Sequence, residues 1–259
     1  MTTASVRLLS TPVLPCGVRE AGNLVAAWAA EGSPRVVCAA NVHMVMEAWD
    51  SAAFAAGLAR ADLVVCDGRP LVWACRLQGV RNASQTRGMD LMLEVCGVAA
   101  RRGLKIGIYG AQPMVAQAVR RQLVEHYADL QVGYCWSPPF RQLTSSEDDA
   151  VIGDIATAGV QILLVGLGCP KQEQWMLAHR ERVSCVMLGV GAAFDMVAGR
   201  TKVAPRWMQH AGLEWAFRLA SEPRRLWRRY ARHNVRFLVL VLGQWLAARC
   251  GGHGGSPAP

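Results

Sequence analysis

The 259-residue sequence lacks an apolar run long enough to cross a bilayer, which takes about 20 consecutive apolar residues. The best stretch, 237–247, is interrupted by Gly243 and Gln244. None of the nine cysteines forms a Cys-x-x-Cys pair, and several lie within apolar runs, which indicates a reducing compartment. The first residues have no basic segment followed by an apolar one, so we expect no secretion signal and a protein of the cytosol or of the cytosolic face of a membrane.

Two signatures of nucleotide-binding enzymes are also missing. No Asp-x-Asp follows an expected strand, which argues against a metal-bound sugar-nucleotide site. Gly166–Gly168 and Gly189–Gly191 each follow an expected strand, but both lack the third glycine of a dinucleotide fingerprint. Lys171 and Phe194 stand at those places instead. On the glycines alone, tight strand-to-helix turns and a phosphate-binding crevice are equally good interpretations.

Acidic residues are scarce in the last quarter of the chain. Residues 1–199 carry 17 basic and 17 acidic side chains, whereas residues 200–259 carry 11 basic side chains and two acidic ones, Glu214 and Glu222. The net charge of +9 therefore lies entirely in this last quarter. Such an asymmetry indicates a segment that faces an anionic partner, either nucleic acid or an anionic membrane surface.

Short apolar runs predict the central sheet. We expect strands at 35–40, 62–66, 104–109, 161–165 and 185–190, with a further strand at 130–135. Helical stretches separate them, so the order alternates between strand and helix and predicts an α/β fold with a mostly parallel sheet and helices on both faces. An early strand is expected within 6–14 and a loop at 136–149.

The carboxyl ends of parallel strands meet at one edge of a sheet, and ligands bind outside that edge. The residues expected there are Asn41, Asp67, Gly110, Gln172 and Asp195. Asp67, partly desolvated by Val65 and Trp73, is a candidate general base with a raised pKa, although Asp-Gly is also a common turn pair. Asn41 is equally a good helix N-cap, and His43 has no partner nearby in the sequence and receives no role.

The character of the chain changes after Val203. Ala204–Met208 begins a helix that we expect to reach Leu219, and Pro223 begins another in which arginines alternate with aromatic and apolar residues. This pattern is typical of an amphipathic helix lying on a membrane. Phe237–Leu242 would be a poor surface against phosphates and a good one against lipid, so we favour a membrane over nucleic acid as the partner.

A string of motifs in this order resembles the WecG/TagA/CpsF glycosyltransferases, glycosyltransferase family 26, over about residues 35–240. The motifs are Val165–Glu173, Gly189–Gly191 through Phe194 and Asp195, Ala198-Gly199, Ala204-Pro205-x-Trp207, Gly212–Trp215 and Glu222-Pro223-x-Arg225-Leu226. The resemblance implies transfer of a sugar from a UDP-sugar to a polyprenyl-diphosphate-linked sugar, with inversion and without a metal ion, during assembly of a surface polysaccharide or teichoic-acid linkage unit. It places the enzyme on the cytoplasmic face of the membrane as a peripheral protein. No cofactor is expected, and a homo-oligomer is compatible with the sequence.

The resemblance also implies roles for individual residues. The family's base aspartate falls on Asp67, its pocket asparagine on Asn41 and its pocket glutamine on Gln172. The basic residues of the appendage that closes over the site and binds the membrane fall around Arg218, Arg225, Arg228 and Arg229. The chain departs from the family at two positions: Ala39 stands for a usual threonine, and Gln85 for a usual arginine, with Arg87 close by.

Further candidates for binding the substrates have plain structural alternatives. Gly110, Gly166 and Gly168 could bring backbone N–H groups to a diphosphate or merely form turns. Lys171 could hold a donor phosphate or begin a helix in solvent. Asp195 could contact substrate, cap a helix, or pair with Lys171 or Arg200. Arg87 and Gln85 could face the crevice or only the surface.

We therefore expect a Rossmann-like catalytic domain over 1–200, a basic helical appendage over 201–250 and a disordered tail over 251–259. Two other functions compete with glycosyl transfer. The arginine-rich helix would also suit a nucleic-acid-binding α/β module, and the glycine turns a nicotinamide-dependent oxidoreductase, although the latter lacks its fingerprint.

Overall fold

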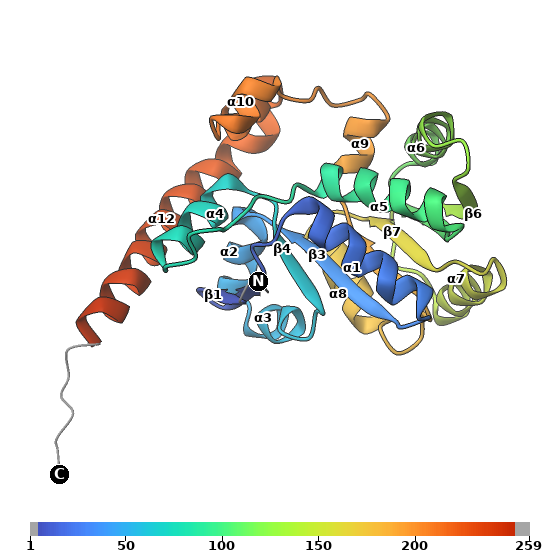
Figure 1. Cartoon of the computed structure of the whole chain (residues 1–259), viewed down its shortest axis with the longest axis horizontal. Coiled ribbons are helices and arrows are strands. Elements are labelled where there is room, and N and C mark those ends of the chain that lie inside the picture. The colour runs from blue at the N-terminus through green and yellow to red at the C-terminus, as the bar shows by residue number, and fades with distance from the viewer. Residues whose placement is uncertain (1–4, 252–259) are drawn as a thin grey trace, which may run out of the picture.

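A six-stranded parallel sheet forms the centre of the computed structural model, which describes residues 5–251 without the side chains of His210, Arg225, Arg229 and Cys250 (Figure 1). Its strand order is β4-β3-β8-β7-β5-β6. The strands are β3 (Arg35–Ala40), β4 (Leu63–Cys66), β5 (Lys105–Gly110), β6 (Gln131–Trp136), β7 (Ile162–Gly166) and β8 (Val186–Gly189). All neighbouring pairs are parallel, which confirms the predicted α/β fold and the expected strands.

Helices cover both faces of the sheet, so its central strands are buried on both sides, as their continuous apolar sequences predict. One face packs against α1 (Val18–Ala30), α5 (Gly88–Arg102), α6 (Pro113–His126) and α9 (Ala193–Val197). The other packs against α2 (Val42–Asp50), α3 (Ala52–Leu58), α4 (Arg69–Leu77), α7 (Ser145–Thr157) and α8 (Lys171–Ala178).

Two local predictions need correction. The expected early strand is a hairpin of β1 (Val6–Leu8) and β2 (Thr11–Val13), because the chain reverses through Leu9 at a φ of 56°. The expected loop at 136–149 ends earlier, because Thr144 and Glu147 form a capping box that starts α7 at Ser145.

The C-terminal segment consists of α10 (Arg206–His210), α11 (Glu214–Ser221) and α12 (Pro223–Gly251). The single helix expected from 204 to 219 is therefore wrong. It is broken at Gly212, which has a φ of 74° and where a β-carbon would lie only 3.0 Å from Trp73 and 3.1 Å from Arg69.

Helix α12 runs along the outside of the body beside α2 and α4 (Figure 1). Its buried residues Phe237 and Val241 join the core cluster of that face. Arg236 Nη1 donates a hydrogen bond to Asp50 Oδ2 at the end of α2 at 2.7 Å, and Nη2 forms an ion pair with Oδ1 at 2.6 Å. No helix within residues 5–251 combines the length and the apolar character that a bilayer crossing requires.

Candidate active site

A cavity lies between the carboxyl ends of β3 and β4 and the C-terminal segment. The body lines it with Asn41–His43, Asp67–Pro70 and Gln85, and the segment with Gln209, Gly212, Glu214, Trp215, Arg218, Tyr230, His233 and Asn234. Helix α2 leaves β3 on one face of the sheet, whereas α9 leaves the neighbouring β8 on the other. A parallel sheet opens a crevice where its connections diverge in this way, so the topology places the cavity where such folds bind ligands.

Asp67 stands in the body wall of this cavity. Its N–H donates to Ala40 O of the neighbouring strand at 2.8 Å, and its Oδ1 accepts the N–H of Gly88 at 2.8 Å. Burial raises the pKa of the carboxyl above its ordinary value. Neighbouring groups oppose this rise, first the Gly88 N–H and then Arg218, Asn41 and Arg87. The carboxylate is thus fixed in place and more basic than an aspartate in water.

Asn41 is the N-cap of α2, as one of its two interpretations predicts, and it also lines the cavity. Its Oδ1 accepts the N–H of Met44 at 3.2 Å and so caps α2, and its side chain also hydrogen-bonds to Asp67. The side-chain amide therefore joins the start of the helix to the carboxylate, and one residue serves the fold and the site together.

Gln85 and Arg87 support the site in different ways. Gln85 Nε2 donates to the backbone oxygen of Asp67 at 2.7 Å, so it holds the main chain of the aspartate. Arg87 pairs with Asp90 at 2.6 Å, donates to the buried Gln209 of α10 and lies 3.9 Å from Glu214. Arg87 thereby links the body to the C-terminal segment, so it is more than a solvent-exposed surface charge.

Glu214, at the start of α11, received no role from the sequence. It lines the cavity. Burial is the main cause that raises the pKa of its carboxyl, and the negative charge of Asp67 raises it further, whereas the positive charges of Arg87 and Arg218 lower it. Two carboxylates, those of Asp67 and Glu214, and two guanidinium groups, those of Arg69 and Arg218, therefore line the cavity. The signal in the sequence was that Glu214 is one of only two acids among the arginines of the last quarter.

Arg218 reaches the cavity from α11, one turn after Glu214. Its Nε is buried and finds no hydrogen-bond acceptor among the residues that the structure describes. One donor of the guanidinium group, Nε, is therefore not used by any residue that the structure describes, and the charge of the group acts on Asp67. Arg228 is exposed and lies over the ring of Trp227, while the side chains of Arg225 and Arg229 fall outside the described residues.

The glycine-rich connection after β7 does not line this cavity. Gln172 is 4% exposed; its Oε1 accepts the N–H of Gly168 at 3.2 Å, and its Nε2 donates to Glu173 at 2.6 Å. A β-carbon at Gly191 would lie 3.2 Å from Gln172, so the amide packs against the turn after β8. The structure thus brings Asn41 and Asp67 together but uses Gln172 to hold two neighbouring turns.

The remaining glycines and charges lie along the same edge. Gly110 packs against the backbone of Gly166, and the Phe194 ring fills the place of a Gly166 side chain, so both glycines are required for packing. Lys171 is exposed, and Asp195 forms no ion pair with Lys171 or Arg200 within the described part of the chain. Asp195 is also not the N-cap of α9, because Ala192 occupies that position. Their roles in binding stay predictions.

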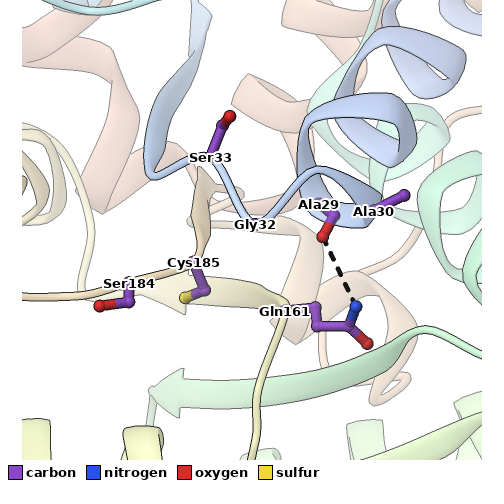
Figure 2. Close-up of a pocket in the computed structure, with 7 residues that line it drawn as sticks. All are labelled: Ala29, Ala30, Gly32, Ser33, Gln161, Ser184 and Cys185. Carbon is purple, nitrogen blue, oxygen red and sulfur yellow. Dashed lines mark hydrogen bonds between the residues drawn. The ribbon is translucent and has the colours of Figure 1, made fainter.

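A second hollow lies at the opposite edge of the sheet, beside the amino ends of β7 and β8 (Figure 2). Gln161 spans it, and its Nε2 donates to Ala29 O at 3.5 Å. Burial raises the pKa of the Cys185 thiol to about 12, so the thiolate is scarce at neutral pH. This hollow offers no group suited to catalysis, which leaves the cavity at Asp67 as the candidate active site.

Comparison with known proteins identifies the family of the chain. A curated relative, the N-acetylglucosaminyldiphosphoundecaprenol N-acetyl-beta-D-mannosaminyltransferase of Bacillus subtilis (strain 168), is 32% identical over 174 residues. The aligned stretch covers 66% of this chain and 65% of the relative, just under two thirds of that protein's length. The model of the glycosyl transferase WecG/TagA/CpsF family matches residues 6–251. The chain therefore belongs to the glycosyl transferase WecG/TagA/CpsF family.

Proposed function

We propose that this chain is an inverting N-acetylhexosaminyltransferase that moves a sugar from a UDP-sugar to undecaprenyl-diphosphate-linked N-acetylglucosamine. The relative's acceptor motivates the choice of acceptor, and the resemblance to the family motivates the donor and the inversion. One observation carries the proposal. A carboxylate whose pKa is raised by burial, that of Asp67, lines one cavity at the ligand-binding edge of the sheet together with the guanidinium group of Arg218, whose Nε has no acceptor among the described residues.

The proposed reaction is a direct displacement. The acceptor hydroxyl attacks the anomeric carbon of the donor from the face opposite UDP, and Asp67 takes the hydroxyl proton as the new C–O bond forms. The bond between that carbon and the diphosphate oxygen breaks, and UDP leaves with the bonding electrons. Asp67 suits the role of base because burial raises its pKa, while the Gly88 N–H holds one carboxylate oxygen and leaves the other for the acceptor.

The leaving diphosphate needs positive charge in place of a metal ion. Arg218 supplies it from α11, and fixed donors of this kind stabilise a developing oxyanion best where water is excluded. Arg87 is occupied by Asp90, Gln209 and Glu214, so we assign it to positioning. Glu214 lies 3.9 Å from Arg87 and lines the cavity with Arg218, so we assign it to orienting the two guanidinium groups, which adds a residue to the predicted site.

A lipid-linked acceptor requires the cavity to lie close to a membrane. On α12 the exposed apolar residues Val235, Leu238, Val239, Leu242 and Leu246 recur at helical spacing. Exposed arginines, among them Arg224, Arg228 and Arg232, precede this stripe. We propose that α12 lies on the anionic cytoplasmic surface as a peripheral anchor. Sedimentation with anionic but not with neutral vesicles is expected, and a Leu238→Ser/Leu242→Ser variant that sediments like the wild type would contradict it.

The function is tested with a panel of UDP-sugars offered together with N-acetylglucosamine linked to polyprenyl diphosphate. We expect one UDP-N-acetylhexosamine to give a lipid product heavier by one sugar residue, with UDP released in equal amount. NMR of the product from that donor reports whether the anomeric centre is inverted. A panel that yields no product with the folded wild-type chain, or a product formed equally well by Asp67→Asn, would refute the proposal.

A further inference from the structure

Two histidines and a glutamate meet beside the cavity, and we name them the His43–Glu47–His233 cluster. His43 and Glu47 are four residues apart on α2 and share one face of that helix. His233 comes from α12, which packs on the same face. His43 Nδ1 lies 3.6 Å and His233 Nε2 lies 4.0 Å from Glu47 Oε1. Residues 190 positions apart in the sequence thus place three metal-binding groups together.

The spacing of these groups approaches that of a zinc site. Bond lengths of about 2.0–2.2 Å at a tetrahedral zinc ion place the ligand atoms roughly 3.3 Å apart. One potential ligand atom from each residue lies within 4.8 Å of the others, and the two imidazole rings are 5.3 Å apart between centroids. Small rotations about the side-chain bonds therefore suffice to bring the three atoms onto one ion.

The chemistry of the ligands selects the class of metal. Two imidazole nitrogens and one carboxylate oxygen suit zinc and similar divalent transition metals, whereas magnesium prefers oxygen ligands. Both imidazoles also line the cavity, so a fourth position on the ion would be open to it. The side chains are partly or largely buried, with exposed fractions of 20% for His43, 35% for Glu47 and 9% for His233.

The cluster also lies at the contact between α2 and α12. One turn further along both helices, Arg236 of α12 pairs with Asp50 of α2, so the two helices already meet through matched polar side chains. Helix α12 continues from α11, which carries Glu214 and Arg218 into the cavity. A metal ion at the cluster would fasten this assembly to the body.

We propose that His43, Glu47 and His233 bind a divalent transition-metal ion of the zinc class, and that this ion fastens α12 to α2. His43 and His233 line the same cavity as Arg218, but none of the three ligands is assigned a part in sugar transfer, so the metal site does not depend on the proposed function. The resemblance implies a reaction that needs no metal ion. The proposed ion is compatible with that, because its role is to hold two helices together and not to take part in the reaction.

The test measures metal binding directly on the full-length chain after treatment with a chelator. Equilibrium dialysis is expected to find one zinc ion per chain, and Co²⁺ is expected to give the visible absorption of a tetrahedral site with nitrogen and oxygen ligands. His43→Ala and Glu47→Gln should each weaken zinc binding at least tenfold, whereas His126→Ala, a change at an exposed histidine of α6, should leave it unchanged. Zinc should raise the Tm of the wild type and of His126→Ala only.

Each other outcome overturns the proposal. Absence of stoichiometric zinc binding would do so, as would binding that persists in folded His43→Ala and Glu47→Gln. Strong thiolate-to-cobalt charge-transfer bands would assign the metal to cysteines instead. His233 is the most buried ligand and its replacement risks misfolding, so the two variants on α2 carry the test, with circular dichroism as the control for folding.

Discussion

The two halves of the ligand-binding edge differ in how their polar groups are used. At the ends of β3 and β4, Asn41 and Asp67 face a cavity and the side chains of α11 across it. At the ends of β7 and β8, Gln172 and Glu173 are buried and bonded to each other and to the turns around them. We call these the open half and the closed half.

This difference separates chemistry from architecture along one edge. In the open half, charged side chains line a cavity, where they can form hydrogen bonds and ion pairs with a substrate. In the closed half, a polar side chain instead forms a hydrogen bond with a backbone N–H of a glycine-rich turn, which stabilises the connection between strand and helix. A replacement in the open half should therefore change the reaction more than stability, and one in the closed half should do the reverse.

The largest effect is expected for Asp67→Asn. Loss of a positioned base lowers the rate about 10²–10⁴-fold, while the amide keeps the size of the side chain, so folding should be nearly unchanged. The measurement is kcat for sugar transfer together with Tm. Asp195→Asn is the matched control from the end of β8, and a loss there as large as at Asp67 would break the distinction between the halves.

The next effect is expected for Arg218→Gln. Removal of one donor to a developing oxyanion lowers kcat roughly 10²–10³-fold. The charge of Arg218 also lowers the pKa of Asp67, so its loss should raise that pKa further and move the acidic limb of the pH profile of kcat/KM to higher pH. Arg121→Gln removes the same charge from an exposed position of α6 and should move neither quantity. A normal kcat in Arg218→Gln would exclude this arginine from the site.

A smaller effect, on stability alone, is expected for Gly110→Ala. Gly110 has a φ of 115°, and a β-carbon there would lie 2.6 Å from the backbone of Gly166. Such overpacking costs roughly 1–3 kcal/mol in the free energy of unfolding. Denaturant unfolding measures it, and the folded variant should retain its kcat within a fewfold. Gly153→Ala in α7, where a β-carbon meets nothing within 4 Å, is the control and should be neutral or stabilising. A variant that stays stable but loses turnover would place Gly110 in the open half.

Local patterns of the sequence were enough for the sheet and for part of the site. Apolar runs bounded by glycine located the strands, and their order placed Asn41 and Asp67 at one edge. The sequence could not distinguish the open half from the closed half, because that depends on which loop Gln172 turns toward. Glu214 and His233 were missed because both reach the body through the long-range packing of α11 and α12, to which no local periodicity points.

The smallest effect is expected for Glu173→Gln in the closed half. Burial raises the pKa of Glu173, so the folded state holds its proton to a higher pH than the unfolded state, in which glutamate titrates near about 4.3. The stability that this proton confers is present at low pH and is lost as pH rises toward the raised pKa.

Glutamine carries no such proton and still accepts the bond from Gln172 Nε2. The variant should thus match the wild type at acidic pH and exceed it at neutral pH, by at most ~1.4 kcal/mol for each pH unit between the two pKa values. Urea unfolding at several pH values measures this difference. The exposed Glu181→Gln should show no such divergence. If Glu173→Gln instead lowered kcat without changing the pH dependence of stability, the closed half would have to be regarded as part of the active site.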